Sequence, residues 1–261
     1  MFLKKKILKS YKKIIFKFKK KINLDALKID IRSLNELFNH FGTDKGSSVI
    51  NPYVKNINKL DKDVLGHGYA EFYENHFSNL KNKEINLLEI GTWKGASIAS
   101  FYHYFKKAKI FCIDRNFKFQ FRSKRVNFFY CNTTINYDIQ KFNEFLIDKE
   151  INLLDIIIDD GSHIYSDILN NFKNFFIKVK PGGYYVIEDY NHYKYYKHLD
   201  DSDFDEIMID DILNHFKLNK NFSSNFLCKD FQNYCLDNIK EISIYKGIQH
   251  DSNIVFIKKN D

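Results

Sequence analysis

Two apolar runs in the second half of the chain end in residues that could bind a metal ion and move a proton. Residues 153–163, LLDIIIDDGSH, end in two aspartates and a histidine, and residues 182–189, GGYYVIED, end in a glutamate and an aspartate. The carboxyl ends of neighbouring parallel strands meet at one edge of a sheet. If the two runs are such neighbours, Asp160, Glu188 and Asp189 converge there.

Three carboxylates that lie close together repel one another, and a hard divalent cation relieves that repulsion. An all-oxygen site suits Mg²⁺ or Mn²⁺, and Fe²⁺ also fits. Sugar hydroxyls that chelate such a cation become more acidic. His163 stands three residues after Asp160, and its imidazole can accept the proton near neutral pH. Another interpretation stays open: the acids are solvated strand ends, and Asp160 or Ser162 caps a helix.

A glycine loop near the middle of the chain indicates a second ligand. Residues 87–97, LLEIGTWKGAS, run from a strand into a helix, with Glu89 at the strand end and Gly91 and Gly95 in the turn. The fingerprint of dinucleotide-binding loops is G-x-G-x-x-G, but Thr92 and Trp93 follow Gly91 without the second glycine. A loop that binds a pyrophosphate is therefore disfavoured. Asp114 ends the following apolar run, where an acid can accept hydrogen bonds from ribose hydroxyls.

Strand-like runs alternate with helical stretches from residue 84 onward, which predicts a parallel sheet covered by helices on both faces. The last two runs are joined by a short polar turn and predict an antiparallel hairpin. We therefore expect an α/β, Rossmann-like fold with a mostly parallel seven-stranded sheet. The expected strands are residues 85–90, 109–114, 126–131, 153–159, 184–189, 241–247 and 252–259, and the clearest helices are residues 97–105 and 166–179.

The chain divides into three predicted parts: a basic amphipathic helix at 1–22, a helical segment at 23–80 that covers the ligand site, and the Rossmann-like domain at 81–261. A polar loop with Gly42, Gly46 and Pro52 interrupts the middle part. The first helix either lies on an anionic membrane surface or docks on the domain with its lysines in solvent. Its apolar stripe consists of Ile7, Leu8, Tyr11, Ile14, Ile15, Phe18 and Ile22.

The net charge of +8 belongs to the N-terminal helix, because residues 1–22 hold ten lysines and no acid, and without them the charge is −2. The rest of the chain is close to neutral and has no basic face of its own, which argues against nucleic-acid binding. No apolar run approaches the ~20 residues of a membrane span. The cysteines form no CxxC pair, so we expect reduced thiols in a cytoplasmic protein, with peripheral contact at the inner face of the membrane left open. They are Cys112, Cys131, Cys228 and Cys235.

These patterns together resemble the metal-dependent sugar O-methyltransferases of the mycinamicin (MycE) type, which are class I S-adenosylmethionine-dependent enzymes. In that family Asp-Gly-Ser-His supplies one metal ligand and the general base, and a Glu-Asp pair supplies the other two ligands. The resemblance implies Asp160, Glu188 and Asp189 as ligands and His163 as base. It also implies S-adenosylmethionine as cofactor, bound by Glu89, Gly91, Gly95, Asp114, Asn132, Thr133, Asp159 and Asp160.

Two upstream segments, FGTDKGS at 41–47 and HGYAEFYENHF at 67–77, resemble the lead-in of the same family, which folds over the cofactor. The resemblance implies cofactor-side or substrate-side roles for five of their residues. Asn132 replaces the acid that usually contacts the adenine side, so this contact is an open point. The five implied residues are Thr43, Asp44, Lys45, His67 and Tyr69.

We expect an O-methyltransferase (EC 2.1.1.-) that acts on a sugar hydroxyl, with a nucleotide-activated sugar for capsule or cell-surface polysaccharide of a bacterium as acceptor. An amine or a non-sugar hydroxyl of a small metabolite is an alternative. A membrane-surface binding protein with an idle Rossmann-like domain is an alternative of another class, and a homo-oligomer is left open. Acceptor contacts are expected from the aromatic segment 190–235, with His192, Tyr193 and Tyr196 as candidates.

Overall fold

Seven strands form one sheet in the order β10-β11-β9-β8-β4-β5-β7 in the computed structural model, which describes residues 12–49, 64–200 and 207–261. The strands from β9 to β7 are parallel to their neighbours, whereas β11 is antiparallel to β9 and to β10. The predicted sheet and its closing hairpin are confirmed. The strands are β4 Asn86–Ile90, β5 Lys109–Asp114, β7 Val126–Tyr130, β8 Leu154–Asp159, β9 Val179–Glu188, β10 Ile239–Lys246 and β11 Asn253–Lys259.

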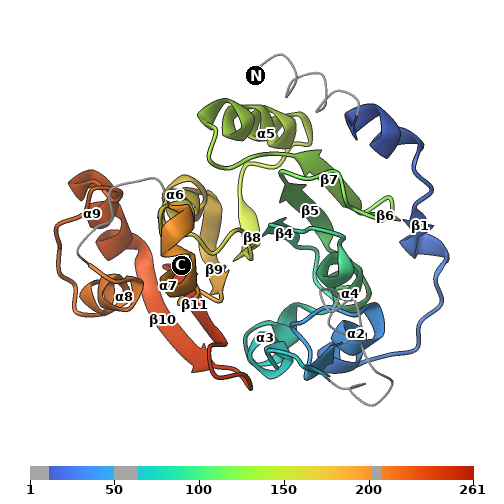
Figure 1. Ribbon diagram of the computed structural model, residues 1–261, viewed down its shortest axis with the longest axis horizontal. Coiled ribbons are helices and arrows are strands. Elements are labelled where there is room, and N and C mark those ends of the chain that lie inside the picture. The colour runs from blue at the N-terminus through green and yellow to red at the C-terminus, as the bar shows by residue number, and fades with distance from the viewer. Residues whose placement is uncertain (1–11, 50–63, 201–206) are drawn as a thin grey trace.

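Each central strand is apolar on both faces, because helices cover both sides of the sheet. In β4, Leu87 packs into one hydrophobic core and Leu88 into the other. The helices α5, α6, α8 and α9 supply the core around Leu88, and α2, α3 and α4 supply the opposite one (Figure 1). The bounds are α2 Leu34–Phe41, α3 Ala70–Phe77, α4 Ala96–Tyr104, α5 Asn136–Asp148, α6 Tyr165–Phe175, α8 Ile209–Lys217 and α9 Lys229–Asn238.

The segment before the sheet contains the helices α2 and α3 on either side of a loop. Ser33 caps α2, since its hydroxyl accepts a hydrogen bond from the amide of Glu36, and Gly42 ends the helix in the left-handed region at φ 73°. The short strands β2, Ser48–Val49, and β3, Val64–Leu65, pair before α3 begins. Pro52 lies outside the described residues.

The chain before this segment is helical at 12–18 and then extended. The helix ends four residues earlier than predicted, because β1, Ile22–Asn23, pairs in parallel with β6, Phe121–Arg122. The part of the predicted helix at 1–11 lies outside the described residues. Within the described ranges, every helix is too short or too polar to cross a lipid bilayer. All four cysteines are free thiols.

Candidate active site

The loop between β4 and α4 passes so close to β8 that only glycine fits at one position. Gly91 has φ +88°, and a Cβ atom there would lie 1.9 Å from the carbonyl oxygen of Asp160. A side chain is excluded both by this contact and by the left-handed backbone. Gly91 therefore lets the loop and the end of β8 meet at one point of the sheet edge.

A cavity of about 480 Å³ opens at this edge, and we call it the ligand cavity. Most of the predicted cofactor residues line it, together with His163 and several residues that the sequence analysis did not single out. The predicted lining residues are Thr43, Gly91, Gly95, Asp114, Asn132, Thr133 and Asp160; the additional polar ones include Arg115, Asn116 and Asp167. Lys45, Tyr69, Glu89 and Asp159 lie outside this lining.

Asp114 sits at the end of β5 with both carboxylate oxygens oriented by the backbone. Oδ2 accepts a hydrogen bond from the amide of Trp93 at 2.7 Å, and Oδ1 accepts one from the amide of Asn116 at 2.6 Å. A carboxylate oxygen has further lone pairs, so an acid fixed in this way can still accept hydrogen bonds from ligand hydroxyls. Asp114 therefore has the position and the free acceptor capacity for a ribose.

Glu89 is buried behind the cavity wall. Its Oε2 accepts a hydrogen bond from the hydroxyl of Thr92 at 2.6 Å, whereas its buried Oε1 has no hydrogen-bond partner within the described ranges. Burial raises the pKa of Glu89. An unpaired buried carboxylate oxygen is costly. Glu89 does not line the cavity, and its hydrogen bond to Thr92 fixes the loop that does.

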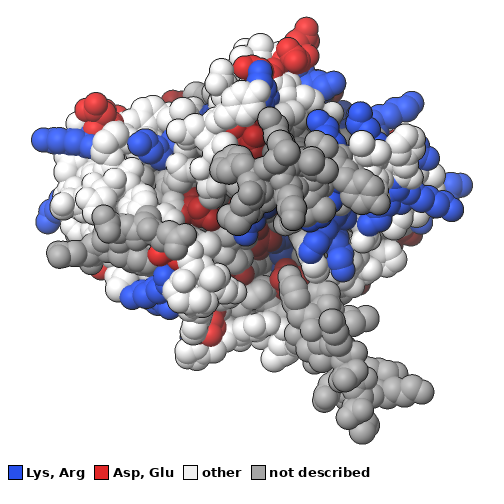
Figure 2. Space-filling view, turned by 45° about the horizontal axis from the view of Figure 1, so that its top comes forward, with Lys and Arg blue, Asp and Glu red and all other residues white. Residues whose placement is uncertain are grey.

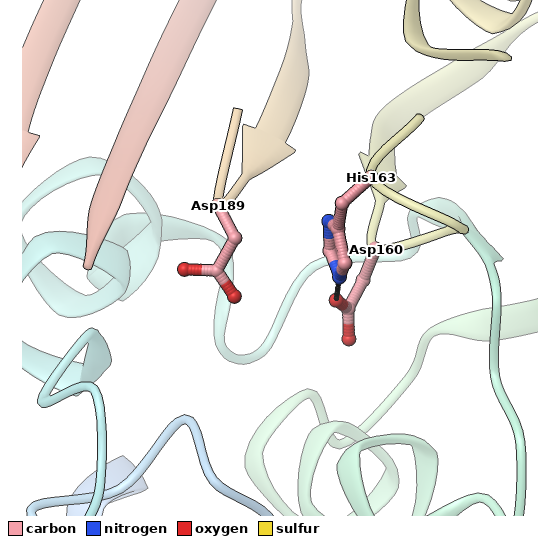
Figure 3. A group of neighbouring side chains, drawn as sticks. All are labelled: Asp160, His163 and Asp189. Carbon is pink, nitrogen blue, oxygen red and sulfur yellow. Dashed lines mark ion pairs between the residues drawn. The ribbon is translucent and has the colours of Figure 1, made fainter. Parts of the chain in front are cut away.

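The strand ends β8 and β9 bring the predicted acids together. These strands are parallel neighbours, with Asp159 paired to Ile187. Donor atoms of Asp160, His163 and Asp189 all lie within 4.8 Å of one another. Figure 3 shows Asp160 and His163 side by side, with Asp189 coming from the adjacent strand end. The His163 Nε2 atom is 3.6 Å from Asp160 Oδ1.

Two members of this group have strained backbones. His163 has φ 56° and Asp189 has φ 48°, in the left-handed region that non-glycine residues rarely occupy. Strain of this kind costs on the order of 1–3 kcal/mol and concentrates at functional sites. The fold thus maintains an unfavourable conformation at both positions, and this aims the imidazole and the carboxylate toward Asp160.

Glu188, the third predicted metal ligand, lies outside that group, and its carboxylate contacts Lys45 and Tyr73. Lys45 Nζ is 2.6 Å from Glu188 Oε2, and the hydroxyl of Tyr73 donates to Oε1. Lys45 also donates to Asp160, although its side chain is only 1% exposed. Lys45 is therefore the counter-charge of two of the predicted acids and does not contact the cavity.

The pKa values at this site follow from burial and from the Lys45 charge. Burial raises the pKa of Glu188 well above its usual value. Burial acts in the same direction on Asp160, but Lys45 and His163 outweigh it and hold the pKa of Asp160 below its usual value. Burial alone would lower the pKa of Lys45, and the carboxylates of Asp160 and Glu188 instead raise it well above its ordinary range.

Asp189 is held from the other side. The hydroxyl of Tyr69 donates to Asp189 Oδ1 at 2.5 Å. The same oxygen lies 3.6 Å from His67 Nδ1 and 3.8 Å from His192 Nε2. Tyr69 and Tyr73 are one turn apart at the start of α3, so this helix orients the two acids of the Glu-Asp pair.

Asp159 points away from the ligand cavity. Its Oδ1 accepts a hydrogen bond from the side-chain amide of Asn171 at 3.0 Å, and its Oδ2 accepts one from the hydroxyl of Tyr185 at 3.2 Å. Burial raises its pKa to about 7. The side chain is 2% exposed, and successive side chains of a strand point to opposite faces. Asp159 therefore supports the strand end from within the core.

The predicted acceptor residues follow β9: His192 directly precedes α7, Tyr193–Tyr196, and the two tyrosines lie within it. The ring of His192 lies 5.7 Å from that of His163, and its Nε2 is 3.0 Å from the carbonyl oxygen of Asp251. Tyr193 is fully buried, with its ring 5.2 Å from that of Tyr165. Tyr196 is 36% exposed, and Tyr195, which the sequence analysis did not select, is 58% exposed. His192 thus lies beside the acid site, whereas Tyr193 belongs to the core.

Known proteins resemble this chain in sequence and in fold. Residues 88–190 match a family model described as "Methyltransferase domain". Over 132 residues the chain is 34% identical to mycinamicin VI 2''-O-methyltransferase of Micromonospora griseorubida. The matched region covers 47% of this chain and 31% of that protein. It is 33% identical over 132 residues to demethylmacrocin O-methyltransferase of Streptomyces fradiae, covering 47% and 32%. The chain spans about a third of the length of these relatives.

The solved structure of the MycE methyltransferase in complex with Mg and SAH superimposes with a TM-score of 0.62 at 22% identity, covering 87% of this chain and 54% of that one. This likeness confirms the predicted methyltransferase fold. The expected resemblance to sugar O-methyltransferases of the mycinamicin type is likewise confirmed by the named relatives. Residues 88–190 thus form a methyltransferase domain.

Proposed function

We propose that this chain, which carries a methyltransferase domain and resembles the mycinamicin-type enzymes, transfers the methyl group of S-adenosylmethionine to a sugar hydroxyl with the help of a divalent cation. The observation that carries the proposal is the meeting of Asp160, His163 and Asp189 at the edge of the ligand cavity. This group combines cation-binding oxygens with a base, next to the cavity in which the methyl donor would lie.

The donor set fits a divalent metal ion. Asp160 and Asp189 offer oxygen ligands from two neighbouring strand ends, and hard cations such as Mg²⁺ and Mn²⁺ prefer such ligands. The nearby imidazole also suits Fe²⁺. Glu188, the third ligand that the resemblance implies, would join them only by exchanging its contact with Lys45. A cation bound there would make the chelated hydroxyls more acidic.

The protein's own residues would then orient the acceptor and remove its proton. Lys45 and Tyr69 fix the carboxylates that face the acceptor. His163 accepts the hydroxyl proton as the new O–CH₃ bond forms and the S–CH₃ bond of the sulfonium breaks, which leaves a neutral thioether. Because the cofactor carries the reactive methyl group, the main work of the protein is positioning.

The cofactor would lie in the ligand cavity. Gly91 admits it close to the backbone, and Asp114 accepts hydrogen bonds from its ribose. Asn132 and Thr133 form the wall where the adenine side is expected. Thr43, from the loop after α2, also lines the cavity.

The acceptor we propose is a nucleotide-linked sugar used for capsule or cell-surface polysaccharide. His192 is the best-placed acceptor contact, since its ring adjoins that of His163. Tyr196 is close along the chain and partly exposed, and Tyr195 is more exposed still. Aromatic side chains combine an apolar face with a polar tip, which suits the mixed surface of a sugar ring.

The proposal is tested by incubating the protein with S-adenosylmethionine, Mn²⁺ and a panel of sugar nucleotides, amines and catechols. We expect methylation of a sugar nucleotide. This methylation should stop when a chelator is added, and it should be lost in the variant His163→Ala. Exposed Asp148→Asn serves as the matched control and should retain full turnover. Methylation confined to amines or catechols, or turnover unaffected by the chelator, would refute the sugar-directed, metal-dependent reaction.

A further inference from the structure

The helix at 12–18 presents its apolar side chains to solvent. Ile14 is 56% exposed, Ile15 is 49% exposed and Phe18 is 85% exposed, and Ile22, just beyond the helix, is 47% exposed. Successive residues of a helix turn by about 100°, so Ile14, Ile15 and Phe18 share one side. Clustered exposed apolar residues of this kind mark interaction surfaces.

The opposite side of the same helix holds it on the domain. The ring of Phe16 lies 5.5 Å from that of Phe117 and 5.1 Å from that of Phe128, and the ammonium of Lys21 is 3.8 Å from the centre of the Phe16 ring. By helix geometry Phe16 points about 150° away from the middle of the apolar side. Within the described residues, Phe16 is thus the side chain of this helix that packs on the hydrophobic core, and Ile14, Ile15 and Phe18 stay exposed.

Lysines surround the uncovered side. Lys12 and Lys17 lie about 110° to either side of its middle, and Lys13, Lys19 and Lys20 are exposed as well. No Asp or Glu occurs between residue 12 and Asp25, so the segment is uniformly positive. Figure 2 shows one face of the molecule, with Lys and Arg side chains gathered on its right-hand part and few acidic ones among them. Exposed basic residues in the adjacent stretch extend the charge: Lys118, Arg122 and Lys124.

We propose that residues 12–22 dock this protein on the surface of an anionic lipid bilayer. Isoleucine and phenylalanine side chains insert at the boundary between headgroups and acyl chains, and flanking lysines contact the anionic headgroups. A nucleic acid would use the lysines but leave the apolar side chains in water. A second copy of the chain would bring two uniformly positive segments together. The combination of both features therefore favours a lipid surface.

Sedimentation of the full chain with vesicles tests this docking. Binding to vesicles of phosphatidylcholine with phosphatidylglycerol should be about tenfold or more tighter than binding to phosphatidylcholine alone. The variant Ile14→Ser/Phe18→Ser should lower binding to the anionic vesicles by about tenfold or more. Its thermal stability should match that of the wild type, because both positions face solvent. The control Ile147→Ser removes an equally exposed isoleucine, at 65%, from α5 and should bind as the wild type does.

Three outcomes would overturn the proposal. Equal binding to both kinds of vesicle removes the requirement for anionic lipid. Unchanged binding of Ile14→Ser/Phe18→Ser shows that lysine attraction alone accounts for the association. A dimer that light scattering detects without lipid, and that this variant abolishes, assigns the surface to a second copy of the chain.

Discussion

Lys45 and Glu188 form a buried ion pair, with Nζ 2.6 Å from Oε2, although 143 positions of the chain separate them. Both side chains are 1% exposed. The pair connects the loop after α2 to the end of β9, and through its second contact Lys45 also reaches the end of β8. One lysine therefore holds the N-terminal segment against the two strands that build the acid site.

Replacing Lys45 should destabilise the whole protein. Lys45→Met leaves Glu188, which is 1% exposed, without its counter-charge, and loss of one partner from a buried ion pair costs about 3–5 kcal/mol. Urea denaturation would measure this change in the free energy of unfolding. Lys141→Met, which removes only the exposed pair with Glu144, should leave the free energy unchanged. If Lys45→Met also leaves the free energy of unfolding unchanged, the ion pair of Lys45 with Glu188 does not stabilise the fold.

Removing the proposed base should slow the reaction without affecting cofactor affinity. His163→Ala should lower kcat by about 100- to 10,000-fold, the range typical for loss of a general base. Calorimetry with S-adenosylhomocysteine should give the same Kd as for the wild type. His250, which is 91% exposed, supplies the matched control His250→Ala. A variant His163→Ala with normal kcat would exclude the imidazole as base.

A side chain at Gly91 should block the ligand cavity. Gly91→Ala adds left-handed strain and drives a Cβ into the carbonyl oxygen of Asp160, so affinity for S-adenosylhomocysteine should fall by about tenfold or more. Gly182→Ala is the control, because Gly182 also has a positive φ of 70°, but its Cβ would meet only the side chain of Asp261, at 3.0 Å. Equal affinities of the two variants would show that the close approach at Gly91 does not shape the cavity.

The stability of the fold should depend on pH through His103. Burial, assisted by the charges of Lys106 and Arg125, lowers the pKa of His103 from 6.5 to about 4. Its Nε2 atom is buried without a hydrogen-bond partner among the described residues, and its ring stacks on Phe41 at 5.6 Å. Between pH 6.5 and 4 the unfolded chain binds the extra proton, so the free energy of unfolding falls as the pH falls through this window.

The variant His103→Phe keeps the stacking and removes the titrating group. Relative to the wild type, it should lose about 2–3 kcal/mol less of the free energy of unfolding between pH 7 and pH 4. Urea denaturation of both proteins at several pH values measures the difference. Parallel pH profiles of the two proteins would show that His103 does not titrate in this range.

The sequence predicts the sheet well because burial on both faces makes each central strand a continuous apolar run, as in β8. It also predicts that Asp160 and Asp189 meet, since parallel neighbours end at the same edge. The ion pair of Lys45 with Glu188 could not be predicted, because nothing local connects residues so far apart in the chain. Tyr69 and Tyr73, four residues apart on a helix, offered a signal: two hydroxyls on one face that need buried partners.

The orientation of short aromatic segments was harder to predict. In α7, packing against Tyr165 buries Tyr193 and exposes Tyr195, and the sequence alone does not fix which side of a four-residue helix faces the core. The N-terminal helix is a similar case. The sequence left open whether its apolar stripe docks on the domain or on a membrane surface, and Phe16, from the opposite side, makes the contact with Phe117.

Titration of Mn²⁺ into the apoprotein, followed by calorimetry, measures whether the ends of β8 and β9 hold a cation. We expect a single site whose affinity falls by about 10- to 100-fold in Asp160→Asn and in Asp189→Asn, with Asp148→Asn binding as the wild type does. The same experiment on Glu188→Gln shows whether the glutamate held by Lys45 joins the site. Wild-type affinity in both Asp160→Asn and Asp189→Asn would contradict a cation held between the ends of β8 and β9.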